Sequence, residues 1–160
     1  MMGLVITPMR ETHLDALAQI ERLCFSQPWT REGLQAELTS ETACFAVAEQ
    51  NGAAVGCAGM QVICGECYID KVAVHPDCRR QGIAQALVGY LIDYAVSNRA
   101  AFITLEVRQS NAPAIALYRK LGFEKVGLRR RFYANPQEDA VLMTRYFAEK
   151  GTTVYSDEFF

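Results

Sequence analysis

Residues 72–88 read VAVHPDCRRQGIAQALV, and this stretch decides the fold. A short apolar run is followed by two arginines and a glycine, and from Gly82 onward apolar side chains recur at helical spacing. The start of a helix leaves backbone N–H groups without partners and carries partial positive charge, so it stabilises a phosphate. Gly82 allows close approach of the backbone, and Arg79 and Arg80 add fixed charge. The stretch predicts a strand, a turn suited to a pyrophosphate, and a helix.

A solvated turn in front of an ordinary helix is the alternative interpretation of this segment. The dinucleotide fingerprint GxGxxG and the Walker sequence GxxxxGK[ST] are both absent from the sequence. A single glycine with two arginines does not decide between the two interpretations, so the rest of the chain has to.

The composition predicts one globular domain. The chain has 160 residues, of which 51% are hydrophobic, and we assign residues 1–150 to a single domain and residues 151–160 to a C-terminal tail. The 16 basic and 18 acidic residues form no long blocks, which argues against binding to nucleic acid or to an anionic membrane. Because we find no secretory signal and no run of 18 apolar residues, we expect a cytoplasmic protein.

The cysteines do not indicate a metal site. Most of the six lie in apolar runs, where a free cysteine behaves as a small hydrophobic side chain. Cys64 and Cys67 have the spacing of half a zinc site, but no second pair follows, and His13 and His75 stand alone. We interpret the segment around Cys64 as a turn between two strands and expect no metal.

Working outward from residues 72–88, the patterns predict an ordered series of elements. Asn51-Gly52 lies between two apolar runs and is a strong hairpin signal. Thr30 and Asn111 are expected N-caps, and Gly122 is expected to end a helix in the left-handed region. We expect strands at 4–7, 43–49, 53–63, 68–74, 102–107, 123–133 and 140–147, and helices at 12–24, from 30, 82–98 and 111–121. This order implies a mixed sheet with helices on both faces.

Three motifs occur in order: VAVHPDCRRQGIAQALV, TLEVRQSNAPAIALYRKLGF and RRRFYANPQEDAVLM. Together they resemble the GCN5-related N-acetyltransferase (GNAT) superfamily, and within it the bacterial ribosomal-protein-alanine N-acetyltransferases. The resemblance covers about residues 4–147. It implies the α/β (α+β) GNAT fold: a twisted, mostly antiparallel mixed sheet of about seven strands, flanked by four helices and splayed between the fourth and fifth strands.

The resemblance also implies how acetyl-CoA binds as co-substrate. The unpaired edge of the fourth strand would take the pantetheine arm through main-chain groups. The turn before the helix would hold the pyrophosphate. The cofactor-binding residues implied are Val72, Ala73, Val74, Arg79, Arg80, Gln81, Gly82, Ile83, Ala84, Asn111 and Tyr118. Asn111 can act as a helix cap at the same time.

Two residues carry the chemistry that the resemblance implies. Glu106 lies in an apolar strand, where a carboxylate needs partners or an upward shift of its pKa, and it is the candidate general base. Tyr118 is the candidate general acid toward the coenzyme A sulfur, with a phenol pKa near that of a thiol. The structural alternatives are an ion pair between Glu106 and Arg108 and a core role for Tyr118.

The acceptor is expected to be a protein N-terminus, namely that of a ribosomal protein that begins with alanine. An α-amine has an unperturbed pKa of ~7.7 to 8.0 and a lysine ~10.4, so the α-amine asks less of the base. Tyr133, Glu138 and Asp139 are candidate acceptor-binding residues; an ordinary hairpin turn is the alternative. Lys71 and Phe132 depart from the subfamily pattern on this side.

Three other functions stay open on sequence alone. The same mechanism could act on a small amine or on a lysine side chain, although the few carboxylates near the closing loop favour polycations less. A non-catalytic acyl-CoA-binding module could retain RRQGIA and dispense with Glu106 and Tyr118, both of which are present.

Overall fold

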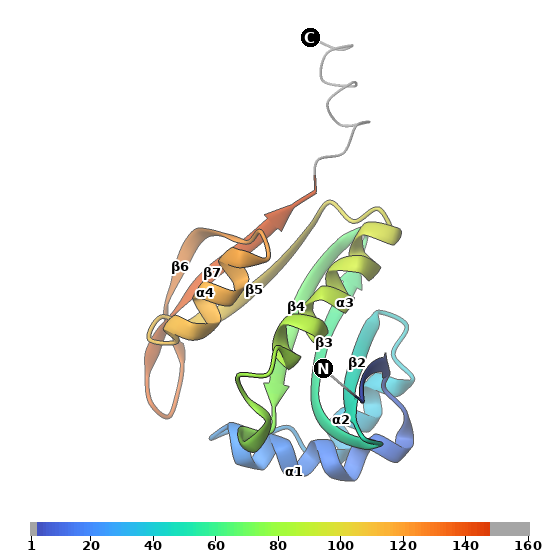
Figure 1. The fold of residues 1–160 in the computed structure, drawn as a ribbon. Helices are drawn as coiled ribbons and strands as arrows, with labels where there is room; N and C mark the ends of the chain where they lie inside the picture. Colours follow the sequence, from blue (N-terminus) through green and yellow to red (C-terminus); the bar gives the residue numbers. More distant parts are fainter. Residues whose placement is uncertain (1–2, 148–160) are drawn as a thin grey trace.

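The computed structural model describes residues 3–147, which form one sheet with helices on both of its faces (Figure 1). In chain order the elements are β1 (Leu4–Pro8), η1 (Glu11–His13), α1 (Leu14–Cys24), α2 (Arg31–Leu38), β2 (Ala43–Gln50), β3 (Ala53–Ile63), β4 (Glu66–Val74), η2 (Pro76–Cys78), α3 (Ile83–Ser97), β5 (Phe102–Arg108), α4 (Ala112–Lys120), β6 (Glu124–Tyr133) and β7 (Glu138–Tyr146). The predicted order of strands and helices is confirmed. The predicted tail, 151–160, lies outside the described residues.

The sheet has the strand order β1-β2-β3-β4-β5-β7-β6. All neighbouring strands are antiparallel except β4 and β5, which are parallel and pair only where Glu66–Tyr68 meet residues 102–104. Beyond this short ladder the two strands diverge, as Figure 1 shows. The predicted splay between the fourth and fifth strands is confirmed, and from residue 69 onward the edge of β4 that faces β5 has no strand partner among the described residues.

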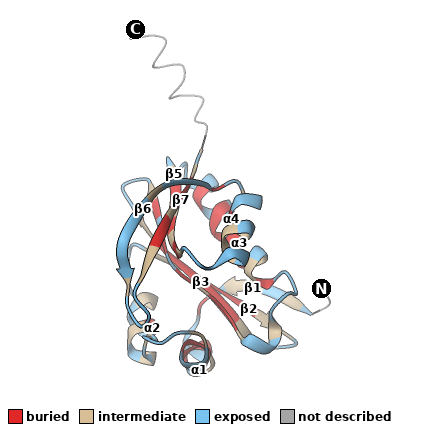
Figure 2. Ribbon diagram, turned by 90° about the vertical axis from the view of Figure 1, so that its left-hand side faces the viewer, coloured by how far each residue is buried: buried red, intermediate tan, exposed pale blue. Residues whose placement is uncertain are grey.

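The two faces of the sheet carry separate cores. Figure 2 shows α1 and α2 on one side of the sheet and α3 and α4 on the other. On β5, Ile103, Leu105 and Val107 are buried in the core beneath α3 and α4, because side chains alternate along a strand. Glu106 and Arg108 therefore project toward the opposite face, on the side of α1 and α2.

A bulge in β4 changes which face its side chains meet. The β3–β4 register pairs Met60 with Ile69 and Gly59 with Lys71, so Asp70 is the extra residue. Ile69 packs in the core beneath α3, whereas Lys71 is buried against α1. Without the bulge, residues 69 and 71 would share one face. The bulge thus brings both Asp70 and Lys71 to the α1 side, directly beside the splay.

The local signals that end and join the elements are confirmed. Asn51 and Gly52 form the β2–β3 turn with φ of 53° and 84°, and Gly122 follows α4 with φ of 93°. Thr30 accepts a hydrogen bond from the Gly33 N–H at 3.0 Å and so caps α2. Within residues 3–147, no helix combines the length and the apolar character needed to cross a membrane.

Candidate active site

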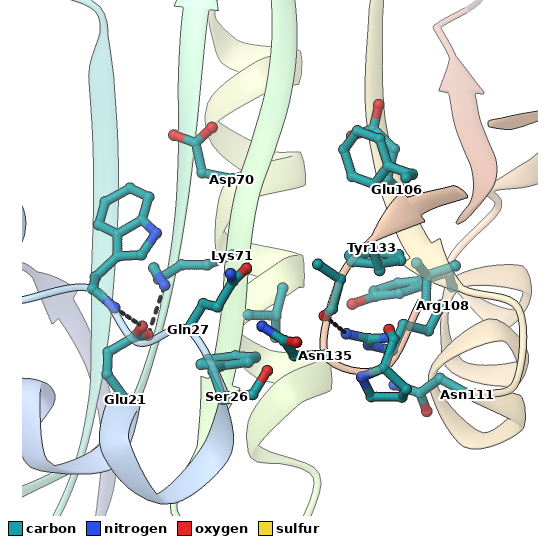
Figure 3. A pocket seen from close by; sticks show the side chains of 18 residues that line it. Glu21, Ser26, Gln27, Asp70, Lys71, Glu106, Arg108, Asn111, Tyr133 and Asn135 are labelled. Carbon is teal, nitrogen blue, oxygen red and sulfur yellow. Dashed lines mark hydrogen bonds and ion pairs between the residues drawn. The ribbon is translucent and has the colours of Figure 1, made fainter. Parts of the chain in front are cut away.

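A cleft opens where β4 and β5 diverge. It has a volume of about 620 Å³. Its walls come from the end of α1 and the loop after it, the bulged part of β4, β5, the start of α4, and the β6–β7 connection (Figure 3). The lining residues are Glu21, Phe25, Ser26, Gln27, Trp29, Asp70, Lys71, Val72, Glu106, Val107, Arg108, Asn111, Tyr118, Phe132, Tyr133, Ala134, Asn135 and Pro136.

Glu106 lies on the β5 wall of this cleft. Its side chain is 27% exposed, and Oε2 forms an ion pair with Nε of Arg129 at 2.9 Å. The sequence alternative of a pair with Arg108 is therefore wrong, because Arg108 is engaged elsewhere: it meets Glu138 at 3.2 Å and the carbonyl oxygen of Pro136 at 2.9 Å. Within residues 3–147, Oε1 of Glu106 has no hydrogen-bond partner and is free to accept a hydrogen bond.

Tyr118 combines a core position with a place in the cleft. It is the buried residue of α4 and packs against Phe123 with ring centroids 5.7 Å apart, yet it also lines the cleft. Burial, with the nearby Tyr133 as second cause, raises the pKa of Tyr118 to about 12. The expectation that its pKa matches that of a thiol therefore does not hold in the free protein. The phenol is a hydrogen-bond donor that stays protonated at neutral pH.

Tyr133 stands at the end of β6 and faces the same cleft as Glu106. The guanidinium carbon of Arg108 lies 4.5 Å from the centroid of its ring. Burial raises the pKa of Tyr133 to about 12, with the Glu106 carboxylate as the next cause. Like Tyr118, it presents a protonated hydroxyl.

Glu138 and Asp139 have partners within the protein and are not among the lining residues. Both lie in β7 and not in the preceding turn. Glu138 Oε2 accepts a hydrogen bond from the Ser110 N–H at 2.6 Å, and Asp139 Oδ1 accepts one from the Arg131 N–H at 2.9 Å. The hydrogen bonds from Ser110, together with Arg108, hold the pKa of Glu138 below its usual range.

The RRQGIA turn presents its backbone to solvent. Arg80 and Gly82 have positive φ, of 62° and 79°, and α3 begins directly after Gly82. Its first turn closes with the bond from Ala86 N–H to Gly82 O at 3.0 Å. The N–H groups of residues 81–85 make no hydrogen bond within the described chain, so they remain available to an anion. The turn itself lies outside the cleft lining.

Three of the predicted cofactor residues reach the cleft: Val72, Asn111 and Tyr118. Asn111 Oδ1 caps α4 by accepting a hydrogen bond from the Ala114 N–H at 3.2 Å, which confirms the cap. Ala73 is buried on the α1 side, and the Val74 carbonyl accepts a hydrogen bond from the Cys24 thiol at 3.4 Å. Arg79 also meets Cys24, with Nη2 3.5 Å from the sulfur.

Sequence reasoning missed the pair of charges at the base of the cleft. Glu21 and Lys71 are 1% and 5% exposed, and they form an ion pair at 2.6 Å. The Trp29 N–H donates to the second Glu21 oxygen at 2.8 Å, and the Lys71 ammonium lies 4.2 Å from the centroid of the Trp29 ring. The departure from the subfamily pattern at Lys71 was the one sequence signal for this pair. Nothing in the local sequence marked Glu21, which lies 50 residues away, as its partner.

Comparisons with known proteins agree with this architecture. The sequence profile of the acetyltransferase (GNAT) family matches residues 14–123. The chain is 36% identical over 140 residues to the [ribosomal protein bS18]-alanine N-acetyltransferase of Escherichia coli K12, covering 86% of this chain and 94% of that one. It is 35% identical over 134 residues to N-alpha-acetyltransferase RimI of Mycobacterium tuberculosis, covering 80% and 83%.

A solved structure gives the same result in three dimensions. The crystal structure of the ribosomal-protein-S18-alanine N-acetyltransferase from Escherichia coli superposes with a TM-score of 0.83 at 34% identity, covering 92% of this chain and 97% of that one. The two proteins therefore share their fold over nearly the whole length of both chains.

Proposed function

This chain belongs to the acetyltransferase (GNAT) family and is an acetyl-CoA-dependent N-acetyltransferase, and from that premise we propose that it acetylates the N-terminal α-amine of a protein. A ribosomal protein that begins with alanine is the acceptor favoured by the names of its relatives. The observation that carries the proposal is the cleft at the splay, which Glu106 and Tyr118 line together. We place this reaction in the cytoplasm, where ribosomal proteins are made.

The free backbone groups support a binding mode for acetyl-CoA. Phosphate oxygens would accept hydrogen bonds from the N–H groups between Arg80 and Ala84, with Arg79 and Arg80 supplying charge. The pantetheine amides would pair with the open edge of β4 along residues 72–74. A pantetheine arm that follows this edge would run from the turn before α3 to Val72 and Tyr118. It would place the thioester in the cleft.

The reaction balances with the groups present. The neutral amine nitrogen attacks the thioester carbonyl carbon, a C–N bond forms, and the C–S bond breaks. We assign the amine proton to Glu106 Oε1, either directly or through a water molecule, because Oε2 is held by Arg129. The departing thiolate receives a hydrogen bond from the Tyr118 hydroxyl. With a pKa about 12, the phenol stabilises the thiolate more readily than it gives up its proton.

The closing loop supplies the acceptor side of the cleft. We propose that Tyr133 contacts the acceptor backbone, since its hydroxyl is protonated and its ring is fixed by Arg108. Glu138 and Asp139 support Tyr133 indirectly and do not contact the acceptor. Their hydrogen bonds with Ser110 and Arg131 hold the loop that carries residues 134–136.

A peptide assay tests the proposal. Purified protein is incubated with acetyl-CoA and two peptides of one sequence, each beginning with alanine and containing one internal lysine, with the α-amine free in one and formylated in the other. We expect tandem mass spectrometry to locate one acetyl group on the free α-amine and none on the formylated peptide. Acetyl groups on lysine in both peptides, or coenzyme A release only with small amines, would overturn the proposal.

A further inference from the structure

The charged groups around the cleft balance almost completely. The cations that line the cleft or contact its carboxylates each have an acidic partner within the protein. The pairs are Lys71 with Glu21 at 2.6 Å, Arg108 with Glu138 at 3.2 Å, and Arg129 with Glu106 at 2.9 Å. Because each pair contributes nearly no net charge, an additional unpaired charge would dominate what the cleft attracts.

Asp70 is that additional charge on the cleft wall, and the nearby Glu37 carboxylate, which shares Gln61 with it and forms no ion pair within residues 3–147, adds a second negative charge outside the lining. Asp70 is the bulge residue of β4, it lines the cleft, and within residues 3–147 it forms no ion pair. The adjacent ammonium of Lys71 is turned toward Glu21. The one hydrogen bond to the Asp70 carboxylate comes from the neutral amide of Gln61, whose Nε2 lies 2.7 Å from Oδ2.

The Asp70 carboxylate is held in place before any acceptor arrives. Gln61 is itself fixed, because Thr42 Oγ1 donates to its amide oxygen at 2.6 Å and its Nε2 also reaches Glu37 at 3.2 Å. The side chain of Asp70 is accessible, but the surrounding cleft walls exclude part of the water around it. This partial desolvation raises the pKa of Asp70. A cation that binds beside a partly desolvated carboxylate stabilises its ionised form.

The location of Asp70 distinguishes it from the catalytic groups. Figure 3 shows Asp70 on the β4 wall and Glu106 on the facing β5 wall. The reacting nitrogen has to lie between Glu106 and Tyr118, so the group that meets Asp70 belongs to the acceptor beyond its terminal amine. In an extended peptide the following residue is the next group available, about 3.3 Å further along the chain.

We propose that Asp70 is a specificity-determining residue that selects acceptors with arginine or lysine directly after the N-terminal residue. The inference rests on the proposed function and deepens it. The cation would bind the carboxylate that Gln61 orients, while the neutralised pairs around the rest of the cleft neither attract nor repel it strongly. A charge-assisted hydrogen bond of this kind corresponds to about a tenfold difference in kcat/KM.

The test uses four peptides that begin with alanine and differ only in the second residue: arginine, lysine, glutamine or glutamate. Wild-type protein, Asp70→Asn and Asp93→Asn are compared; Asp93 is an exposed carboxylate on α3 and serves as the matched control. For the wild type and the control we expect kcat/KM about tenfold higher with arginine or lysine than with glutamine. In Asp70→Asn that ratio should fall to near one through KM, with kcat retained.

The outcomes separate this inference from the proposed function. Wild-type protein that acetylates no α-amine would overturn both. Acetylation of α-amines with the arginine-to-glutamine ratio unchanged in Asp70→Asn would overturn the role of Asp70 alone. An equal loss on all four peptides would also overturn it, because a merely structural effect does not depend on the second residue. A further variant, Asp70→Lys, should reverse the preference and favour glutamate.

Discussion

At the scale of single residues, two side chains that line the cleft differ in how far they are exposed to solvent. Glu106 is partly exposed and paired, whereas Tyr118 is buried and held neutral by its surroundings. A base needs an accessible lone pair, and a hydrogen-bond donor to a thiolate needs to keep its proton. The two environments therefore suit the two proposed roles.

Replacing Glu106 by glutamine tests the role of the base. The amide is close to isosteric and retains a polar contact with Arg129, so we expect acetyl-CoA to bind with unchanged affinity while kcat falls by about 10² to 10⁴. Calorimetric titration with acetyl-CoA and steady-state kinetics measure the two quantities. Glu124→Gln, at an exposed position on β6, is the control. Equal losses of binding and turnover would show that Glu106 is structural.

Replacing Tyr118 by phenylalanine tests the donor to the sulfur. We expect kcat to fall about 10²-fold with little loss of stability, since the phenylalanine ring refills the site beside Phe123.

The pH profile of kcat adds a second test of Tyr118. A phenol is neutral below its pKa, and a pKa raised to about 12 keeps Tyr118 protonated until the pH approaches that value. Consequently kcat of the wild type should show no titration of Tyr118 below about pH 11.

The result that contradicts this account is an alkaline loss of kcat near pH 10 that disappears in Tyr118→Phe. It would mean that the phenol has an ordinary pKa when acetyl-CoA is bound.

At the scale of elements, the starts of α3 and α4 perform two tasks at once. Each must close its own first turn, and we propose that each also binds acetyl-CoA. For each helix start, a second residue in the chain has a comparable structural role away from the proposed cofactor site. Comparing variants of the two residues separates an effect on stability from an effect on acetyl-CoA binding.

Asn111 and Thr30 cap α4 and α2 through the same kind of side-chain hydrogen bond, at 3.2 and 3.0 Å. Replacing either by alanine should lower the free energy of unfolding by about 1 kcal/mol. Only Asn111→Ala should raise KM for acetyl-CoA, because Asn111 lines the cleft and Thr30 does not. Urea denaturation and initial rates measure both effects. The same KM in the two variants would restrict Asn111 to capping.

Gly82 and Gly89 provide the corresponding comparison in α3. An added Cβ would meet nothing within 4 Å at either position, but Gly82 has φ of 79° and Gly89 is helical. Gly82→Ala should cost about 1 to 2 kcal/mol of stability and weaken acetyl-CoA binding, because the turn would relax away from its left-handed geometry. Gly89→Ala should stabilise the helix by about 0.5 to 1 kcal/mol and leave binding unchanged. Thermal denaturation and titration with acetyl-CoA decide the matter; unaltered binding in Gly82→Ala would contradict the pyrophosphate role.

Local signals predicted the elements well where backbone chemistry alone fixes the outcome. The Asn51-Gly52 turn and the left-handed Gly122 follow from residue type, because few other residues adopt positive φ without strain. Glu138 and Asp139 were expected in a turn and lie in β7, where Glu138 pairs with Tyr133 of β6 and the two carboxylates find donors in Ser110 and Arg131. Those donors come from other elements, which no local pattern identifies.

At the scale of the whole molecule, the splay and the bulge create the site together. The splay was predicted from the resemblance to a family and not from periodicity, and the bulge at Asp70 was not predicted. A single extra residue leaves the apolar pattern of β4 nearly unchanged while it places Ile69 and Lys71 on opposite faces of the sheet. The partners of Glu106, Lys71 and Asp70 all depend on strand register, which cannot be predicted from the local sequence pattern.

The buried pair of Glu21 and Lys71 joins the helical layer to the sheet across this bulge, and its energetics make the last prediction. Both side chains are nearly inaccessible, so removing one charge leaves the other buried without a partner. Glu21→Gln and Lys71→Met should each lower the free energy of unfolding by about 3 to 5 kcal/mol. The double variant should lose far less than the sum, because no uncompensated charge remains and the introduced glutamine amide still offers an oxygen to the Trp29 N–H. Guanidinium denaturation of the four proteins gives the coupling energy, and additive losses would mean that the two charges act independently and that the layer is held by the apolar contacts of α1 alone.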